Sequence, residues 1–230
     1  MSPYENLLLA DPTRRIALCA QLEDGAESAW EDLAAAVGTA PILAGGDLGD
    51  LRLFLCRLPG RTLAFAYLTA SAASDGGGVP AGLAQRPWWR DLSGCVRDGW
   101  SRMEFINLVA HPRVFPHPPQ ATVQRLGLVA GLRPASEPLY RSLHQTNWPG
   151  VVERMVRSNY RAWTTFLTGI GDELLLFTTV EYSGTDRSAD DAATAADPVT
   201  RRWWRNTEPC LIPLLPGGGN WTTMRRILPA

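Results

Sequence analysis

A phenol and an imidazole lie four residues apart in the second half of the chain, as Tyr140 and His144. Leu139 and Leu143 form an apolar stripe beside them at the same spacing, which favours a helix. On a helix, residues four apart lie on one face, one turn from each other. Because an imidazole titrates near neutral pH and a phenol can donate a proton, the pair could move protons to and from an oxygen-bearing substrate. The alternative is a structural histidine that only makes a hydrogen bond.

Two adjacent tryptophans, Trp203 and Trp204, lie in a later segment that we expect to be helical. Adjacent side chains on a helix point about 100° apart, so at most one indole can line a pocket while the other packs on the sheet. An indole face can stack on a sugar ring or an aromatic substrate. Core packing is the alternative, because Trp88 and Trp89 occur in the first half, where the Tyr/His pair is missing.

The chain repeats itself, and the repeat defines the elements that must position these side chains. Three anchors occur in the same order in both halves, and their offset grows from 110 to 115 to 121 residues. Three ordered matches indicate a tandem duplication with small insertions in the second copy. The anchors are Arg15–Leu22 with Arg125–Leu132, Arg86–Arg90 with Arg201–Arg205, and Trp100, Met103 and Ile106 with Trp221, Met224 and Ile227.

A proline-rich segment marks the boundary between the copies. Four prolines lie within His111–Gln120, which is typical of a stiff linker rather than of a helix or a central strand. We therefore predict a first unit at residues 12–108, a linker at 109–121 and a second unit at 122–230.

Several polar segments are expected at the surface. The histidines of the linker, His111 and His117, should be exposed. The polar stretch Ser183–Asp197, one place for an insertion, predicts a surface loop. Its acidic residues have no histidine nearby, so we expect a solvated loop and no metal site.

Each copy has the same expected order of elements, which is clearest in the second copy. A short apolar run predicts a strand, helical spacing follows, and two further strands flank the hairpin signal Gly169–Asp172. The order β-α-β-β-α-β is the ferredoxin-like motif of α+β proteins. Because helices would cover only one face of each sheet, we predict that the two sheets face each other in a pseudo-dimeric α/β barrel. The expected strands are Arg125–Leu132, Arg161–Thr168, Glu173–Glu181 and Trp221–Leu228, and the expected helices run over Pro134–Ser142, over Val151–Val156 and around Trp203 and Trp204.

The second copy resembles the L-rhamnose mutarotases over roughly residues 123–228. The resemblance rests on Tyr140-x-x-x-His144-x-x-x-Trp148-Pro149, a hairpin, and then Arg202-Trp203-Trp204. It implies a dimeric barrel of ferredoxin-like units that interconverts the α and β anomers of a free sugar without a cofactor.

The resemblance also implies roles for particular residues. Tyr140 and His144 correspond to the catalytic pair of the family, and the Trp148, Trp203 and Trp204 positions correspond to substrate-binding aromatic residues. A further aromatic pair of the family is matched only loosely by Tyr160 and Trp163. This chain departs from the family in its length. The family's chain is about half as long and forms a dimer.

The first copy lacks the catalytic pair. At the offset of 110 residues, Trp30 stands in place of Tyr140 and Ala34 in place of His144. Proton transfer must therefore use the second copy, and the pocket of the first copy should be apolar, smaller or filled.

Composition excludes several other classes of function. The net charge of −1 gives no basic field for nucleic acid or for an anionic membrane surface. The chain has no lysine, which excludes Schiff-base chemistry through that residue. Its four scattered cysteines fit buried reduced thiols, with Cys19 and Cys56 inside apolar runs. Met1–Ala10 does not resemble a signal peptide, so we expect a cytoplasmic protein with a small-molecule substrate, no cofactor and no metal.

Three functions remain open at this point. The first is a mutarotase-like isomerase. The second is a cofactor-free polyketide cyclase of secondary metabolism, since nine tryptophans and a duplicated chain suit a specialised apolar substrate. The third is a non-catalytic protein that binds a ligand. The fused pair needs no second subunit to complete it, although further oligomerisation is compatible with the sequence.

Overall fold

The structure is a computed structural model that describes residues 14–37, 48–70 and 78–228. The predicted start of the first unit at residue 12, the segment Met1–Ala10 and the last two residues lie outside these ranges. The chain forms two compact units. The N-terminal unit holds the described residues up to Phe105 together with those from Thr223 onwards, and the C-terminal unit holds Ile106–Thr222.

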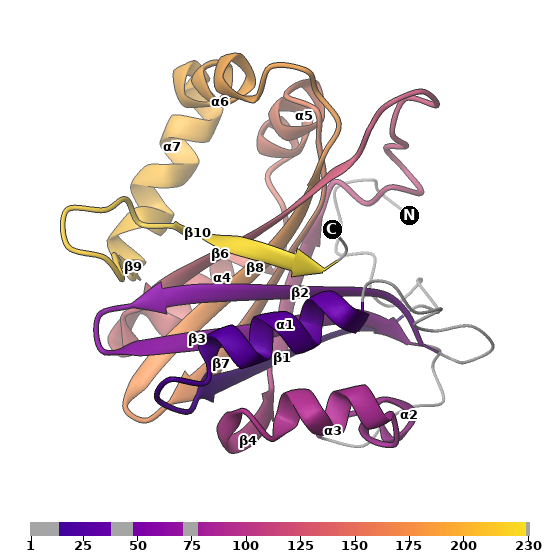
Figure 1. Cartoon of the computed structure of the whole chain (residues 1–230). Helices are drawn as coiled ribbons and strands as arrows, with labels where there is room; N and C mark the ends of the chain where they lie inside the picture. Colours follow the sequence, from indigo (N-terminus) through magenta and orange to yellow (C-terminus); the bar gives the residue numbers. More distant parts are fainter. Residues whose placement is uncertain (1–13, 38–47, 71–77, 229–230) are drawn as a thin grey trace. The chain divides into compact units, whose positions relative to one another are not determined.

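The N-terminal unit has a five-stranded antiparallel sheet in the order β4-β1-β3-β2-β10 (Figure 1). The first four strands follow the 4-1-3-2 order of a ferredoxin-like motif. Its elements are β1 (Arg14–Leu22), α1 (Glu27–Val37), β2 (Leu48–Leu58), β3 (Arg61–Ala70), α2 (Ala81–Ala84), α3 (Pro87–Ser93), β4 (Val96–Arg102) and β10 (Thr222–Leu228).

The C-terminal unit repeats this arrangement with the strand order β9-β6-β8-β7-β5. The α+β class and the two ferredoxin-like units predicted from the sequence are confirmed. The elements are β5 (Glu104–Val109), β6 (Gln124–Leu132), η2 (Pro134–Ser136), α4 (Glu137–His144), α5 (Pro149–Arg157), β7 (Tyr160–Ile170), β8 (Glu173–Tyr182), α6 (Arg187–Ala196), α7 (Pro198–Thr207), η3 (Glu208–Cys210) and β9 (Leu211–Ile212).

The last strand of each half lies in the unit that the other half builds. Strand β5 is the neighbour of β7, and the yellow strand β10 lies beside β2 in Figure 1. We expected Trp221–Leu228 to be the fourth strand of the second copy, but that position is taken by the short strand β9. Pro213 follows β9 directly and cannot donate to the ladder, so the strand ends and the chain continues to a new partner.

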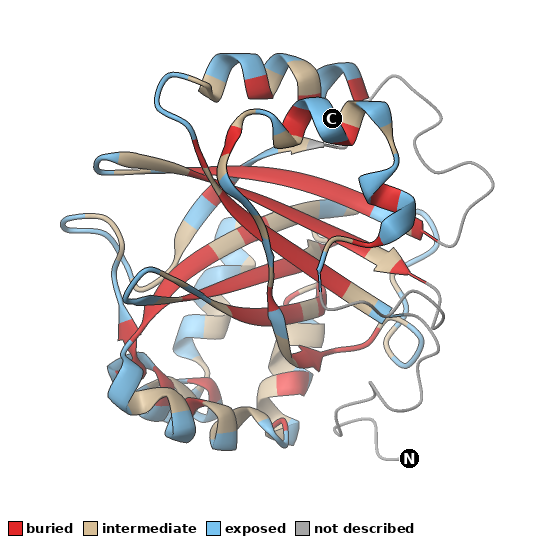
Figure 2. Ribbon diagram, turned by 90° about the horizontal axis from the view of Figure 1, so that it is seen from below, coloured by how far each residue is buried: buried red, intermediate tan, exposed pale blue. Residues whose placement is uncertain are grey.

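Alternating apolar residues attach the helices to one face of each sheet. In the N-terminal unit, every second residue of β1 from Ile16 to Leu22 joins the same apolar cluster as Trp30, Ala34 and Val37 of α1. Every second residue of a strand faces the same side, as does every third or fourth residue of a helix. These residues of β1 and α1 therefore meet on one face of the sheet. Figure 2 shows buried residues on the strands and exposed residues on the outer sides of the helices. Cys19 and Cys56 are buried and free, as expected.

A β-bulge recurs at the same place in both units. The pairing register shifts between Gly49 and Arg52 of β2 and between Arg161 and Thr164 of β7. Each bulge contains a residue with a left-handed backbone, Asp50 with φ 47° and Ala162 with φ 50°. An extra residue in a strand changes which face the following side chains occupy. The shared bulge supports the duplication and brings Tyr160 and Trp163 to one face.

Two expectations about the surface were wrong. Ser183–Asp197 is not a loop, because it contains helix α6, which begins where the Asp186 side chain accepts a hydrogen bond from the backbone N–H of Ala189 at 3.0 Å. Alanine-rich sequence and this N-cap together favour a helix. The linker histidines are not exposed either. His111 is 5% exposed, and Nε2 of His117 lies 2.8 Å from a carboxylate oxygen of Glu181.

The bulge of β7 should carry measurable backbone strain. A non-glycine residue in the left-handed region costs about 1 kcal/mol or more, so Ala162→Gly should raise the free energy of unfolding by about 1 kcal/mol. Urea unfolding measures the change. The matched control is Ala130→Gly in β6, which should lower stability because glycine weakens an ordinary strand position. A stabilising effect of both substitutions, or of neither, would contradict strain at the bulge.

Candidate active site

Helix α4 brings Tyr140 and His144 together as the sequence predicts. Their rings are stacked, with centroids 4.1 Å apart and planes inclined by 27°. Tyr140 is 2% exposed and packs in a cluster with Leu167 of β7 and Leu176 of β8. The helix begins with Pro138 in its first turn and Glu137 beside its positive end, both of which favour a helix start here.

The helix backbone holds the imidazole of His144 in one orientation. Its Nδ1 lies 2.7 Å from the carbonyl oxygen of Tyr140, so Nδ1 carries the proton and donates it in this bond. The other ring nitrogen, Nε2, is then left with a lone pair. Burial lowers the pKa of His144 to about 4, with the hydrogen bond to the Tyr140 carbonyl acting in the opposite direction. The imidazole is therefore neutral at pH 7 and can accept a proton at Nε2.

The phenol of Tyr140 is set for the complementary role. Burial raises its pKa well above the ordinary value, with Cys210 adding a smaller effect in the same direction. The hydroxyl group is therefore protonated over the whole physiological range and can donate. A neutral base and a protonated acid on one helical turn are the two groups that a reversible proton transfer needs.

Two of the expected tryptophans complete a continuous group of rings with this pair. Trp203 of α7 meets His144 edge to face, with centroids 5.2 Å apart, and meets Trp148 at the same distance. The guanidinium of Arg202 lies 5.6 Å from the Trp148 ring centroid, which adds a cation–π contact. Trp148 precedes Pro149, the first residue of α5, so the turn between α4 and α5 fixes its place.

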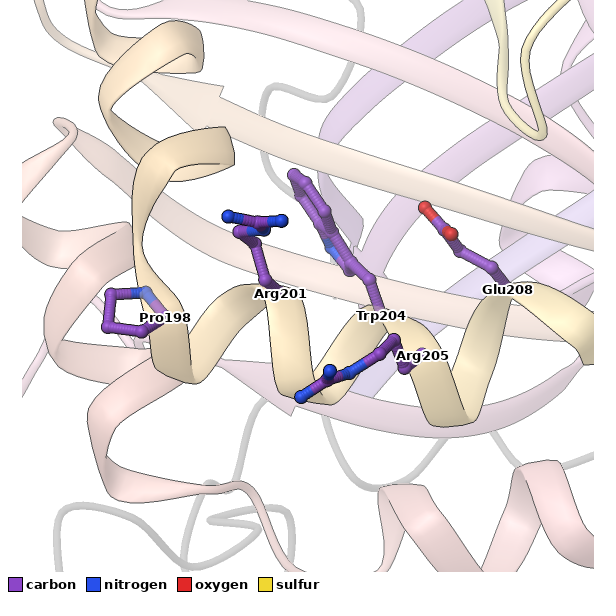
Figure 3. Close-up of a pocket in the computed structure, with 5 residues that line it drawn as sticks. All are labelled: Pro198, Arg201, Trp204, Arg205 and Glu208. Atoms are coloured by element: carbon purple, nitrogen blue, oxygen red, sulfur yellow. The ribbon is translucent and has the colours of Figure 1, made fainter.

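Trp204 lies elsewhere. It lines a hollow of about 400 Å³ together with Pro198, Arg201, Arg205 and Glu208 of the same helix and its end. Figure 3 shows Arg201, Trp204 and Glu208 extending from the same side of α7. The ring contacts among the described residues do not join Trp204 to His144 or Trp148. As expected for neighbours on a helix, the two indoles point apart.

Tyr160 and Trp163 form a second aromatic group on β7. Their centroids are 6.2 Å apart, and Tyr182 packs 5.1 Å from Tyr160. The two tyrosine hydroxyls donate to helix α6, Tyr160 to Asp191 and Tyr182 to Asp190. These carboxylates were expected in a solvated loop, and the alanine-rich segment around them was the signal for a helix.

A pair of buried threonines separates the two aromatic groups. The hydroxyls of Thr165 on β7 and Thr178 on β8 lie 3.0 Å apart, and both residues are at most 2% exposed. Along β8, Leu176 belongs to the cluster of Tyr140 and Val180 to the cluster of Tyr160, so Thr178 lies between them. This threonine pair was not predicted, because threonine is common in strands and gives no distinctive signal.

The N-terminal unit has more apolar residues than the C-terminal unit at the equivalent positions. Trp30 and Ala34 are 0% exposed and lie in one continuous apolar cluster, as expected for a filled pocket. In the C-terminal unit, the apolar packing of the described residues on this face is divided into separate clusters. When β2 is aligned with β7 and β3 with β8 from their first residues, the equivalent residues can be read off. Leu48 corresponds to Tyr160, Leu51 to Trp163, Leu53 to Thr165 and Ala66 to Thr178.

Within residues 14–37, 48–70 and 78–228, no group of three or more His, Cys, Asp or Glu side chains could hold a metal ion. No helix in the described part of the chain is long and apolar enough to cross a membrane.

The second half of the chain matches a known family. Residues 125–228, a little less than half of the 230-residue chain, match the family model of L-rhamnose mutarotase. The resemblance predicted from the sequence is confirmed, and it supports an isomerase-type enzyme with a small-molecule substrate. None of the curated proteins matches the chain.

Three solved structures are similar to the chain over both units. A protein from Fusobacterium nucleatum, provisionally described as a monooxygenase, is 9% identical, with a TM-score of 0.50 over 94% of this chain and 92% of that chain. A protein from Lactobacillus acidophilus with the same provisional description is 11% identical, with a TM-score of 0.46 over 93% and 94%. An anthrone oxidase-like protein is 8% identical, with a TM-score of 0.47 over 94% and 91%. At such identities the likeness is one of fold alone.

The buried neutral imidazole should make stability depend on pH. The pKa of His144 is about 4 in the folded protein, against about 6.5 in an unfolded chain, so the unfolded state binds more protons between these values. The contribution of His144 to the free energy of unfolding is therefore complete above about pH 6.5 and is lost as the pH falls towards 4. Urea unfolding at pH 7 and pH 5 measures the loss, which should be smaller in His144→Ala. Nitrogen NMR that finds the ring charged at pH 6 would contradict the prediction.

Proposed function

We propose that the C-terminal unit is a cofactor-independent isomerase that interconverts the anomers of a free sugar. The observation that carries the proposal is the stacked Tyr140–His144 pair, in which the backbone bond to Nδ1 leaves Nε2 as the base. The match of residues 125–228 to the L-rhamnose mutarotases supports the same reaction class.

The reaction needs two proton transfers in each direction. Nε2 of His144 takes the proton of the anomeric hydroxyl while the Tyr140 hydroxyl gives its proton to the ring oxygen. The bond between the anomeric carbon and the ring oxygen breaks, and its electrons stay on that oxygen. The oxygen–hydrogen electron pair of the anomeric hydroxyl becomes the second bond of the aldehyde.

Closing the ring reverses these transfers. After rotation about the bond next to the aldehyde, the imidazolium returns its proton to the carbonyl oxygen and the tyrosinate takes the proton of the attacking hydroxyl. Ring closure from the opposite face gives the other anomer. No net proton is gained or lost, so the enzyme returns to its starting state.

The surroundings of the pair explain how such weak groups can react. Burial makes Tyr140 a weak acid and His144 a weak base when each is considered alone. During the reaction their charges are opposite and the rings are 4.1 Å apart. In a medium of low dielectric constant this attraction is much stronger than in water, so the two transfers favour each other. The Trp203 indole beside His144 supplies a face on which a sugar ring can stack.

A second candidate is cyclisation of a larger, planar substrate. The aromatic group of Tyr160, Trp163 and Tyr182 beyond the threonine pair is what favours it. Exchange NMR of the two anomers of L-rhamnose discriminates the candidates, because a mutarotase broadens and exchanges the anomeric signals and a cyclase does not. Binding of the sugar without exchange would favour a non-catalytic ligand-binding protein.

Removing either member of the pair should abolish most of the activity. Loss of a positioned acid or base costs on the order of 10² to 10⁴ in rate, so His144→Ala and Tyr140→Phe should each reduce anomer exchange by about that factor. The fold should tolerate the first change, because Ala34 is fully buried at the equivalent position of the N-terminal unit. Ser142→Ala, an exposed position on the same helix, is the matched control and should keep the wild-type rate. Near-wild-type exchange in both site variants, with folding verified by circular dichroism, would make the pair structural.

The rate should also depend on the protonation of His144. The base form is the neutral imidazole, whose pKa is about 4. We therefore expect kcat/KM for sugar exchange to be constant from about pH 8 down to about pH 5 and to fall as the pH approaches 4. A profile that already falls near pH 6.5 would show that an ordinary, solvated histidine controls the rate.

A further inference from the structure

Two buried asparagines join strand β5 to the turn between α4 and α5. Asn107 of β5 is 1% exposed, and Asn147 is 7% exposed. Nδ2 of Asn107 donates to Oδ1 of Asn147 at 3.3 Å, and Nδ2 of Asn147 donates to the carbonyl oxygen of Leu108 at the same distance. Both residues belong to the C-terminal unit. A polar contact of this kind inside a protein has to be explained, because burying amides among apolar groups is costly.

The hydrogen bonds fix the orientation of both amides. The Leu108 carbonyl can only accept, so it faces the NH₂ group of Asn147 and leaves the oxygen of that amide towards Asn107. That oxygen in turn faces the NH₂ group of Asn107. The remaining end of the pair is therefore the carbonyl oxygen Oδ1 of Asn107.

This oxygen is buried and has no hydrogen-bond partner in the described structure. An unsatisfied buried acceptor typically costs about 1 to 3 kcal/mol. A protein can retain such a group where a ligand completes the bond. Oδ1 of Asn107 is therefore an acceptor that is already oriented and removed from water before a ligand binds.

The sequence neighbours of both asparagines contact the candidate site. Asn147 lies directly before Trp148 and three residues after His144. On the other side, Ile106, the neighbour of Asn107, packs in the cluster that contains Tyr140. Strand β5 thus contacts the surroundings of both catalytic candidates.

The equivalent positions of the N-terminal unit carry apolar residues. Val37, buried in the apolar cluster, is equivalent to Asn147 at the offset of 110 residues. Leu228 is equivalent to Asn107 at the offset of 121 residues that relates the third anchor. The unit without the Tyr/His pair therefore lacks both asparagines too. A purely structural amide pair would have no reason to be absent together with the acid and the base.

We propose that Oδ1 of Asn107 is a substrate-positioning group that accepts a hydrogen bond from a hydroxyl group of the ligand. The inference rests on the proposed function and specifies its substrate class, a polyhydroxylated molecule with a donor besides the reacting hydroxyl. It also makes the first half of the chain a contributor to the site, because β5 is the last strand of that half.

The test compares sugar binding by the wild type and by the double variant Asn107→Leu/Asn147→Val. The double variant copies Leu228 and Val37 and leaves no asparagine unpaired, so it should remain folded. Titration calorimetry with L-rhamnose and its monodeoxy analogues gives the dissociation constants. Asn206→Ala, which removes an exposed asparagine on α7, is the matched control.

We expect the double variant to bind L-rhamnose about 3- to 10-fold more weakly, the usual range for a neutral hydrogen bond. One monodeoxy analogue should bind the wild type more weakly by a similar factor but should bind the double variant as well as L-rhamnose does. In the wild type, the side-chain NH₂ signals of Asn107 should shift on addition of the sugar, and this measurement does not depend on the variant's folding.

Other results have distinct meanings. Equal affinities of the wild type and the double variant for all analogues would overturn the inference and make the amides a structural link. Absence of L-rhamnose binding to the wild type would overturn it as well. The expected binding pattern without exchange of the anomers would support the role of Asn107 and refute the isomerase.

Discussion

The short hydrogen bond between Nδ1 of His144 and the carbonyl oxygen of Tyr140 is the interaction on which the proposed chemistry depends. It ties the imidazole to the helix that also carries the phenol, so one rigid element sets the distance, the stacking and the tautomer together. The surrounding rings then have only to exclude water. Trp203 and Trp148 do this from α7 and from the turn before α5. The resulting burial keeps the imidazole neutral and the phenol protonated.

Comparison of the two units shows how a duplicated fold loses or keeps a site. Both sheets have the same strand order and the same bulge, so the backbone positions for a pocket exist twice. In the N-terminal unit these positions carry leucine, alanine and valine, and the helix packs directly on the sheet. Apolar side chains at these positions need no hydrogen-bond partners, and their burial stabilises the unit. The C-terminal unit gives up part of this packing for threonine, asparagine and histidine.

The sequence predicted what depends on local spacing. The repeat, the Tyr140–His144 helix, the strands and the stop at Trp148-Pro149 follow from periodicity and from proline. The pairing partner of an edge strand cannot be predicted from local spacing, because an apolar run such as Phe105–Val109 can pair with any open edge. Asn107 was not predicted, because a single asparagine in a strand becomes informative only when its neighbours in space are known. The buried state of His111 and the helix at Arg187–Ala196 were missed because polar composition alone suggested solvent.

The exchange of β5 and β10 has a consequence for synthesis of the chain on the ribosome. The partner of β2 is built from Thr222–Leu228, so this edge has no partner until the ribosome has passed the whole C-terminal unit. Before that moment β2 offers free backbone groups and an apolar surface to any other extended segment. The nascent N-terminal unit therefore lacks its fifth strand while the C-terminal unit is translated, and its open edge is exposed to wrong pairing during that time.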